Sequence, residues 1–526
     1  MKKALALLLA VCLVLALTAC GGSAAPAASN APAASSSGSG NAAAPAAEGK
    51  DSVSVSVESV ISTLDPYETL AYTSWFVFNQ IYETLVTVDD NGNVQPCLAT
   101  AWEVSEDGCT YTFTLETGVK FHDGSDFTAK DAAYSLTEAM KHPAMQGYTK
   151  AIESVEVVGD NQIACKLLKP SASFVSMMSE IPIVSEAFYS AQENNIDVGV
   201  GTGPYMLTDQ KDLNREVVLT RFDGYRKGPA AIKDVHLKVV SDASTSVAAF
   251  ETGDLDFLTV YNISSYAGLA ANDKYNSALC ATLHTAYTTM NLEKEPLDNK
   301  LLRQAMSYAI DYDSVIVINY EGLAKRAYAL MGENSFGADF TDIVKYEYNP
   351  ELAKQLLAEA GFPDGIDFAD YGIEYDYIPG GYHEKIAQCV QQNWADVGIK
   401  INLRANDNID SDAPDGNFSI GTEGGTYTAD MSFMSIIYGT EGIGGNNYSR
   451  YSNPEVDELF AEADATTDQA VRLANYKKIC EIVSEDACYI PIQHKQIPYV
   501  WYSDLNAVVH LSSAHPWYCY EWSWNA

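Results

Sequence analysis

The stretch that decides the fold is LATAWEVSEDGCTYTFTLETGVKFHDGSDFTAKDAAYSL, residues 98–136. Within it Tyr111, Phe113 and Leu115 alternate with polar residues, which is the pattern of a half-buried strand. Residues 128–131 (TAKD) then form a capping box ahead of a helix with one apolar face. A strand joined by turns to a capped helix indicates mixed α/β structure.

Outward from this stretch, strand and helix signals alternate along the chain. A strand is predicted where Val53, Val55 and Val57 alternate with polar residues. Helices are predicted after the possible cap Asp298, at the two Asn-Pro-Glu starts and over 385–397. The two Asn-Pro-Glu starts are residues 349–351 and 453–455. The fold class predicted from these signals is α/β.

Composition and charge limit the function classes. The chain has 526 residues, enough for roughly three compact units. It is 47% hydrophobic and 19% charged, which is a globular composition. Its formal net charge of -38 repels phosphate backbones and argues against basic patches on anionic lipid. We therefore expect no nucleic-acid partner.

The N-terminus carries a targeting signal. Residues 4–17 are apolar after a basic head, and about 21 Å of helix is too short to span a bilayer. The sequence ending at Cys20 resembles the bacterial lipobox, which implies removal of residues 1–19 and diacylation of Cys20. The alternative is a plain secretory signal with an incidental cysteine. Residues 20–49, rich in Ala, Ser, Gly and Pro, are predicted to be a flexible tether.

Searches for catalytic and cofactor motifs give no match. No GxSxG, HExxH, P-loop or CxxC pattern occurs, and the eight histidines are scattered. The glycine run 199–203 is followed by Pro204 and a strand, so we interpret it as a close backbone crossing. Four aspartates between 407 and 415 suggest calcium, but the spacing misses the EF-hand pattern and a solvated loop is favoured. We predict no metal, no cofactor and no enzymatic activity.

Many short motifs follow one another in the order found in one protein family. Besides residues 98–136, they are LDP (64–66), IYETLV (81–86), GTGPY (201–205), ETGDLDF (251–257), RQAMSYAID (303–311), LLAEAGFPDG (356–365), DVGIKINL (396–403), YSNPEVDEL (451–459) and IPI (490–492). The chain thereby resembles the family 5 extracellular solute-binding proteins, the peptide and nickel receptors of ABC importers. The resemblance implies a two-lobed periplasmic-binding-protein-like (Venus flytrap) fold, with an extra subdomain in lobe I.

Mapped onto this chain, the resemblance implies a division into segments. Lobe I combines residues 50–86, 201–290 and 490–526, the extra subdomain covers 87–200, and lobe II covers 291–489. Two chain crossings between the lobes would allow them to rotate with few dihedral changes.

The resemblance also implies a ligand site. The family's ammonium-binding acid corresponds to Asp430, the aromatic wall to Tyr427, and Thr428 lies between them. The alternative for Asp430 is a solvated loop acid. From lobe I, we expect Tyr72, Thr73, Ser74 and Trp75 to line the cleft, although Trp75 is equally compatible with a core aromatic. For the ligand carboxylate, Arg404 and Arg450 are possible, and no motif supports either.

The predicted function is that of a lipid-anchored receptor on the extracytoplasmic face of a bacterial cell membrane. It would capture a small peptide, close around it and deliver it to the transmembrane subunits of an ABC permease, acting as a monomer. A buried peptide needs partners for its backbone groups and a carboxylate for its ammonium. Alternatives are a nickel chelate, haem or glycan ligand in the same fold, an exported lipoprotein enzyme, or a sensor without transport.

Overall fold

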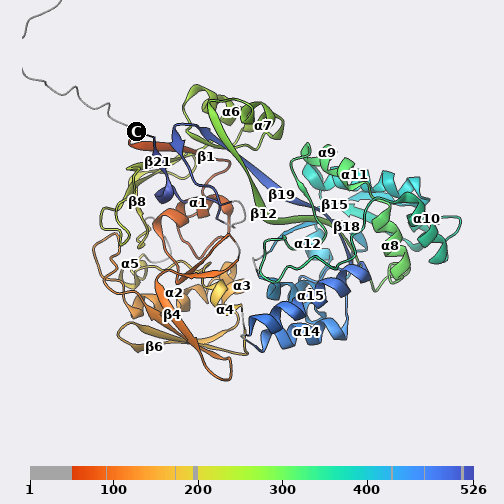
Figure 1. The fold of residues 1–526 in the computed structure, drawn as a ribbon, viewed down its shortest axis with the longest axis horizontal. Coiled ribbons are helices and arrows are strands. Elements are labelled where there is room, and N and C mark those ends of the chain that lie inside the picture. Colours follow the sequence, from red (N-terminus) through yellow and green to blue (C-terminus); the bar gives the residue numbers. More distant parts are fainter. Residues whose placement is uncertain are drawn as a thin grey trace, which may run out of the picture. The chain divides into compact units, whose positions relative to one another are not determined.

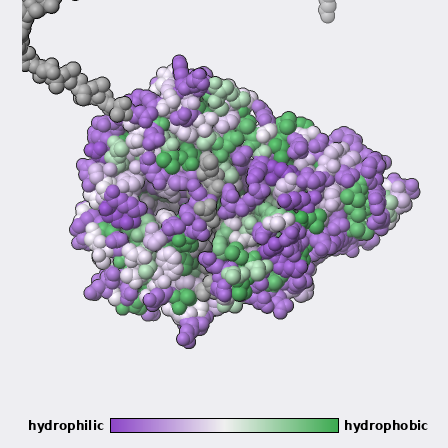
Figure 2. Space-filling model, in the orientation of Figure 1, coloured by the Kyte–Doolittle hydropathy of each residue, from purple (hydrophilic) through white to green (hydrophobic). Residues whose placement is uncertain are grey.

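A computed structural model describes residues 50–90, 92–171, 173–192, 199–427, 430–466, 468–510 and 515–525. The signal peptide, the acylation site Cys20 and the tether predicted over residues 1–49 lie outside the described residues. Residues 49–526 form one compact unit. Figure 2 shows hydrophilic residues interspersed with small hydrophobic patches over the visible face of this unit.

One sheet of eleven strands extends through the compact unit. Its strand order is β17 (Asn402–Ala405), β15 (Glu374–Tyr377), β18 (Ile420–Thr426), β12 (Tyr275–Met290), β19 (Tyr489–Tyr502), β11 (Phe257–Thr259), β1 (Ser52–Val57), β10 (Asp234–Val239), β9 (Glu216–Arg221) and β8 (Tyr205–Asp212), with β13 (Lys325–Arg326) paired to β19. Strand β1 runs parallel to both β10 and β11. The predicted strand at Val53–Val57 is confirmed, and the sheet is mixed rather than purely parallel.

The long strands β12 and β19 join two groups of elements, as Figure 1 shows. The half of β19 around Tyr499 pairs with β11, next to β1. The half of β12 from His284 to Met290 pairs with β18. Between these halves the β12–β19 register shifts from Ala281 to Thr285, which is a bulge. The sheet therefore changes its neighbours where β12 is bulged.

Separate hydrophobic cores lie on either side of this bulge. One is built on β1, α1 (Tyr72–Ile81) and the strands near them, and it includes Phe257 and Trp517. A second contains Met306 and Trp394, and a third contains Tyr476 and Phe460. Because each core collects its own apolar side chains, the two groups of elements have independent packing.

The helices cover the sheet in both groups. Those of eight residues or more, besides α1, are α2 (Ala129–Ala139), α6 (Ala243–Thr252), α7 (Ile263–Ala270), α8 (Lys300–Tyr308), α9 (Tyr312–Tyr320), α10 (Pro350–Glu359), α11 (Gly381–Asp396), α14 (Pro454–Asp464) and α15 (Gln469–Asp486). Shorter ones are α3 (Gln146–Thr149), α4 (Phe174–Met177), α5 (Glu186–Tyr189), α12 (Ile409–Asp412) and α13 (Ser435–Tyr438). The predicted caps Asn349 and Asn453 are confirmed. The cap of α8 is Asn299 and not Asp298, because the Asn299 side chain accepts from the amides of the first turn.

The stretch 98–136 forms part of a second, four-stranded sheet and the helix beside it. The sheet has the order β4 (Ala99–Val104), β5 (Thr110–Leu115), β7 (Gln162–Leu167) and β6 (Ile152–Gly159). The predicted capping box at Thr128 and Asp131 is present at the start of α2. Three strand pairs complete the secondary structure: β2 (Val86–Val88) with β3 (Val94–Pro96), β14 (Ile366–Asp367) with β16 (Ile399–Lys400), and β20 (Leu505–Asn506) with β21 (Ser523–Trp524).

The glycine run before β8 is the predicted backbone crossing. A Cβ placed on Gly201 would lie 1.9 Å from the carbonyl oxygen of Ile81, and the amide of Gly203 donates to the same oxygen. Only glycine lets the two backbones approach this closely. The crossing fixes the end of α1 beside the start of β8.

Candidate ligand-binding site

The bulge in β12 positions a group of polar side chains between the cores. Opposite the bulge, Lys495 is carried by β19, and the Thr282 hydroxyl donates to the Lys495 carbonyl oxygen at 2.8 Å. The neighbouring His494 turns to the other side, where its Nδ1 lies 2.8 Å from the Thr285 hydroxyl. Because side chains alternate along a strand, the Lys495 ammonium lies on the face opposite to His494.

Two residues from the ends of parallel strands lie near Lys495. Glu58 follows β1 directly, and Tyr261 follows β11 after one further residue. The Glu58 carboxyl and the Tyr261 hydroxyl are buried and interact with each other, but no well-directed hydrogen bond joins the Glu58 Oε2 atom or the Tyr261 hydroxyl to a described residue. In open α/β sheets, ligands bind beyond the carboxyl ends of the strands, which is where these two side chains lie. The structure thus leaves poorly hydrogen-bonded polar groups at a position suited to a ligand.

Burial sets the electrostatics of this group. It raises the pKa of Glu58, and the nearby Tyr261 and Lys495 lower the same pKa without offsetting the effect of burial. Burial lowers the pKa of Lys495, and Glu58 opposes this. Glu58 and Lys495 therefore influence each other, yet no ion pair within 4.0 Å joins them.

His284, on the bulge itself, completes the group. Its Nε2 lies 3.2 Å from the Tyr382 hydroxyl, and its Nδ1 is buried without a hydrogen-bond partner. Burial, with a smaller contribution from the Lys495 charge, lowers the pKa of His284 to about 4. His284 is therefore neutral at pH 7 and offers a hydrogen-bonding nitrogen without a charge.

The four residues predicted on α1 have different surroundings. The Tyr72 hydroxyl is hydrogen-bonded to the Tyr499 hydroxyl at 2.9 Å, and Glu58 is among the groups that affect its pKa, which burial raises. The Thr73 hydroxyl donates to the Val60 carbonyl oxygen at 3.2 Å, and the Ser74 hydroxyl lies 3.3 Å from that of Ser62. Tyr72 therefore lies close to the group of polar side chains around Lys495. The Thr73 and Ser74 hydroxyls make hydrogen bonds within the protein.

Trp75 lies in the first core with 6% of its surface exposed. Its ring stacks on His515, with centroids 4.7 Å apart, and meets Phe78 edge to face. The His515 Nε2 lies 3.2 Å from a Glu180 oxygen. The remaining exposed edge of Trp75 leaves it able to contact a ligand only over a small area.

Tyr427 and Asp430 follow β18 and are both largely buried, and Thr428 between them lies outside the described residues. The Tyr427 amide donates to the Leu283 carbonyl oxygen, which ties this segment to the β12 bulge. Its hydroxyl is buried and interacts with Tyr287, without a well-directed hydrogen bond to a described residue. The Tyr427 ring belongs to the third core.

Asp430 is bound to a cation of the protein itself. One Arg472 nitrogen lies 3.3 and 3.2 Å from the two Asp430 carboxylate oxygens, and the same nitrogen donates to the Tyr476 hydroxyl. Asp430 also accepts from the Ser432 amide. Its surroundings are therefore those of a buried ion pair and not of a solvated loop acid.

A polar groove of about 230 Å³ lies close to this ion pair. One side is lined by Val104–Gly108, Tyr111, Pro170 and Ser171, and the other by Asp464–Thr466 at the end of α14. Burial raises the pKa of Asp464 to about 6, and the nearby Arg472 lowers it in part. The groove thus lies between the four-stranded sheet and the α14–α15 region.

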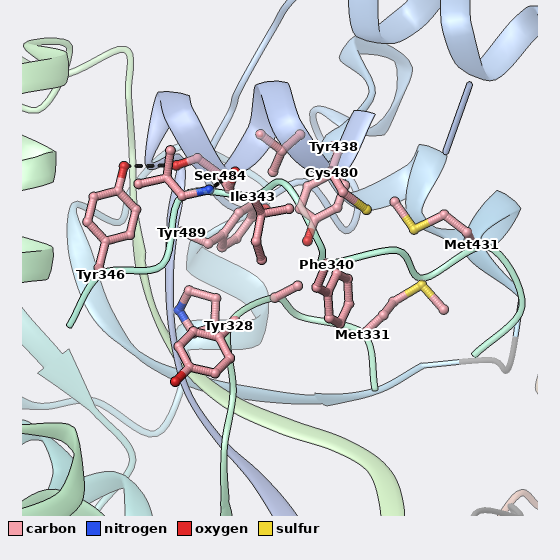
Figure 3. A pocket seen from close by; sticks show the side chains of 14 residues that line it. Tyr328, Met331, Phe340, Ile343, Tyr346, Met431, Tyr438, Cys480, Ser484 and Tyr489 are labelled. Atoms are coloured by element: carbon pink, nitrogen blue, oxygen red, sulfur yellow. Dashed lines mark hydrogen bonds between the residues drawn. The ribbon is translucent and has the colours of Figure 1, made fainter. Parts of the chain in front are cut away.

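An apolar cavity lies within the third core, beside Met431 (Figure 3). Tyr328, Phe340, Tyr438 and Tyr489 are among the side chains around it, and Tyr346 donates to the Ser484 carbonyl oxygen at its edge. Its volume is about 30 Å³, room for one or two water molecules. It is too small for a peptide side chain of ordinary size.

The two arginines considered for a ligand carboxylate are bound elsewhere. Arg404 makes two hydrogen bonds to the Asp376 carboxylate, at 2.6 and 2.7 Å. Arg450 lies 2.5 Å from Glu293. Sequence reasoning missed Glu58, His284 and Lys495, although charged or imidazole side chains within otherwise apolar strands were an available signal.

Within the part of the chain that the structure describes, no group of three or more His, Cys, Asp or Glu side chains is arranged to hold a metal ion. The eight cysteines from Cys97 onward are free thiols. None of the described helices combines the length and apolar character that crossing a bilayer requires.

Comparison with known proteins adds a family and a fold. Residues 93–445 match the model of the bacterial extracellular solute-binding proteins, family 5 Middle. Heme-binding protein A of Haemophilus influenzae is 31% identical over 79% of this chain and 82% of its own length. Glutathione-binding protein GsiB of Salmonella choleraesuis is 29% identical over 85% and 89%. The solved structure of HbpA2 from Haemophilus parasuis has a TM-score of 0.81 at 25% identity, covering 90% of this chain and all of that one.

Proposed function

The chain belongs to the family 5 bacterial extracellular solute-binding proteins, and from this premise we propose that it captures small peptides between two lobes for an ABC importer. It is a substrate-binding protein of ABC transporters, and its α/β fold is the two-lobed fold of that family. Peptide capture, delivery to the permease and the division into lobe I, extra subdomain and lobe II given above are part of the proposal.

The observation that carries the proposal is the group of buried polar side chains around Lys495. Among the described residues, His284 Nδ1 has no hydrogen-bond partner, and the Glu58 carboxyl and the Tyr261 hydroxyl interact with each other without a well-directed hydrogen bond. Buried polar groups are nearly always well hydrogen-bonded, so a group of poorly bonded ones favours a bound ligand that supplies better partners. A peptide, which presents both donors and acceptors, suits such a site.

Asp430 is proposed to bind the peptide ammonium, as the family resemblance implies, with Tyr427 and Thr428 beside it. Arg472 now supplies its positive partner, so an incoming ammonium would share the carboxylate with Arg472 or replace it. A carboxylate has about four lone-pair positions, which allows more than one donor at once. Tyr72 and Trp75 are proposed as the lobe I contacts of the same ligand.

Haem is the second candidate ligand. The relative that is 31% identical is named for haem binding, and haem would also place carboxylates in the cleft. The decisive experiment is native mass spectrometry of residues 49–526, the compact unit, purified without added ligand. Co-purified peptides would support the first candidate, and a co-purified porphyrin would support the second. A chain that retains neither, and that binds neither when they are added, would contradict both.

The acid proposed to bind the ammonium can be tested by one substitution. We predict that Asp430→Asn weakens peptide binding more than tenfold in calorimetry, because a buried ammonium then loses its counter-charge. Asp415→Asn, at an exposed loop acid, is the matched control and should bind as the wild type does. Unchanged affinity of the Asp430 variant would remove Asp430 from the site.

The membrane anchor is proposed to be the diacylated Cys20, holding the chain at the extracytoplasmic face of the cell membrane as a monomer. Two acyl chains give stable anchoring, whereas one does not. Cys20→Ser should release the protein from the membrane fraction, as followed by fractionation of cells. Membrane retention of the variant would contradict the anchor without bearing on ligand capture.

A further inference from the structure

Lys495 differs from every other lysine in the described part of the chain. The other half-buried lysines have a hydrogen-bond or ion-pair partner, such as Lys294 with the Ser419 hydroxyl, or take part in an interaction of another kind. Lys495 is half-buried, yet its ammonium makes no hydrogen bond and no ion pair within 4.0 Å among these residues. A partly desolvated ammonium without a close partner is unfavourable, and such a cost is retained where it serves function.

The surroundings of Lys495 do not supply a paired anion. Glu58 is the acid near it, but the two do not reach ion-pair distance, and burial favours the neutral form of Glu58. Among the described residues, the His284 Nδ1 has no hydrogen-bond partner, and the Tyr261 hydroxyl interacts with Glu58 without a well-directed hydrogen bond. These neutral groups can hydrogen-bond an oxygen atom without competing with Lys495 for its charge.

We propose that Lys495 binds a carboxylate of the captured ligand, with His284 and Tyr261 as hydrogen-bonding neighbours. The inference rests on the proposed function and adds to it the residue that recognises the acidic group. The position supports it, since β19 joins the two groups of elements and Lys495 lies opposite the β12 bulge. The ligand class that follows is a solute with a free carboxylate.

Other cations are less suited to this role. Arg404 and Arg450 are held by Asp376 and Glu293. Arg326 donates to the backbone carbonyl oxygens of Pro491 and Tyr346, and Arg472 is paired with Asp430. For each of these, a ligand carboxylate would first have to displace an existing partner. Lys495 requires no displacement.

The test compares ligands that differ only in the acidic group. Residues 49–526 would be given a defined mixture of di- to pentapeptides with free carboxyl termini, and the same mixture with amidated termini. A second arm would use haemin and its dimethyl ester, which separates the two sources of carboxylate. Binding to the wild type, Lys495→Met, Lys495→Arg and the exposed control Lys400→Met would be measured by native mass spectrometry.

We expect the wild type, Lys495→Arg and Lys400→Met to bind the free acid at least tenfold more tightly than the blocked form. Lys495→Met should bind both forms alike, at the affinity of the wild type for the blocked form. If Lys495→Met keeps the preference for the acid, or loses acid and blocked forms equally, the role of Lys495 is wrong while ligand capture stands. If the wild type binds neither peptide nor haemin in any form, the proposed ligand classes fail, and this inference fails with them.

Discussion

Two pairs of opposite charges lie near the proposed cleft, and they differ in how far they are joined. Arg472 and Asp430 are in contact at 3.2 Å, with 7% and 11% of their side chains exposed. Lys495 and Glu58 affect each other's pKa but make no ion pair. The charges of the first pair are in contact, although the Arg472 Nε has no hydrogen-bond partner among the described residues, whereas the charges of the second pair stay apart.

The difference between the two pairs distinguishes a contribution to stability from a contribution to ligand binding. A buried ion pair that is closed contributes structure, because each ion is costly to bury without the other. Two opposite charges that are not in contact gain no contact energy from each other, so each can pair with an opposite charge on a bound ligand. A ligand that binds Asp430 must therefore share or break an existing ion pair, whereas a ligand that binds Lys495 breaks none.

The largest effect is expected when the ion pair between Arg472 and Asp430 is broken. Arg472→Met should lower the free energy of unfolding by about 3–5 kcal/mol, because Asp430 then keeps a buried, uncompensated charge. Urea denaturation followed by circular dichroism measures this. As control, Lys477→Met removes a surface ion pair with Asp342 and should change the free energy of unfolding little, because solvent screens exposed charges. A loss below about 1 kcal/mol for Arg472→Met would erase the distinction between the two pairs.

A pH titration sharpens the comparison, because it tests how far water is excluded from the region around Lys495 and Glu58. Burial lowers the pKa of His284 and His494 from 6.5 to about 4 each. The unfolded chain takes up these protons below about pH 6.5, but the folded chain does so only near pH 4. The free energy of unfolding should therefore fall as the pH falls through this window, by up to about 1.4 kcal/mol per pH unit for each histidine.

Unfolding in urea at several pH values between 7 and 5 measures this slope. His494→Gln should reduce the slope by the contribution of the one proton that His494 takes up on unfolding. Asp464, whose pKa is raised to about 6, opposes the trend, because its folded form takes up a proton first. A stability that does not change between pH 7 and 5 in both proteins would mean that water reaches these histidines.

The smallest expected effect concerns the pair of Lys495 and Glu58 itself. Lys495→Met should leave the free energy of unfolding unchanged or raise it by about 1 kcal/mol, because it removes a desolvated charge that has no close partner. Lys294→Met is the matched control: that lysine is also half-buried but donates to Ser419, so its loss should cost about 1 kcal/mol. Thermal unfolding of both variants measures the difference. A marked loss of stability in Lys495→Met would show that Lys495 serves the structure.

Local features were within reach of sequence reasoning because neighbouring residues carry them. The Thr128–Asp131 capping box and the caps Asn349 and Asn453 each depend on a side chain meeting an amide two or three residues away. The crossing at Gly201 was also predicted, from glycines followed by proline. The exact cap of α8 was missed by one residue, since both Asp298 and Asn299 can cap a helix.

The sequence by itself determined the α/β class, the helix starts and, through its run of motifs, the family. Which charges meet was decided only by the tertiary structure. Asp430 and Arg472 come together from the segment after β18 and from α15, and Lys495 approaches Glu58 because β19 lies beside β11 and β1 in the sheet. Such contacts depend on strand order and on a bulge, and neither leaves a periodic signal in the chain. Burial then fixes which ions are neutralised within the protein and which remain for a ligand.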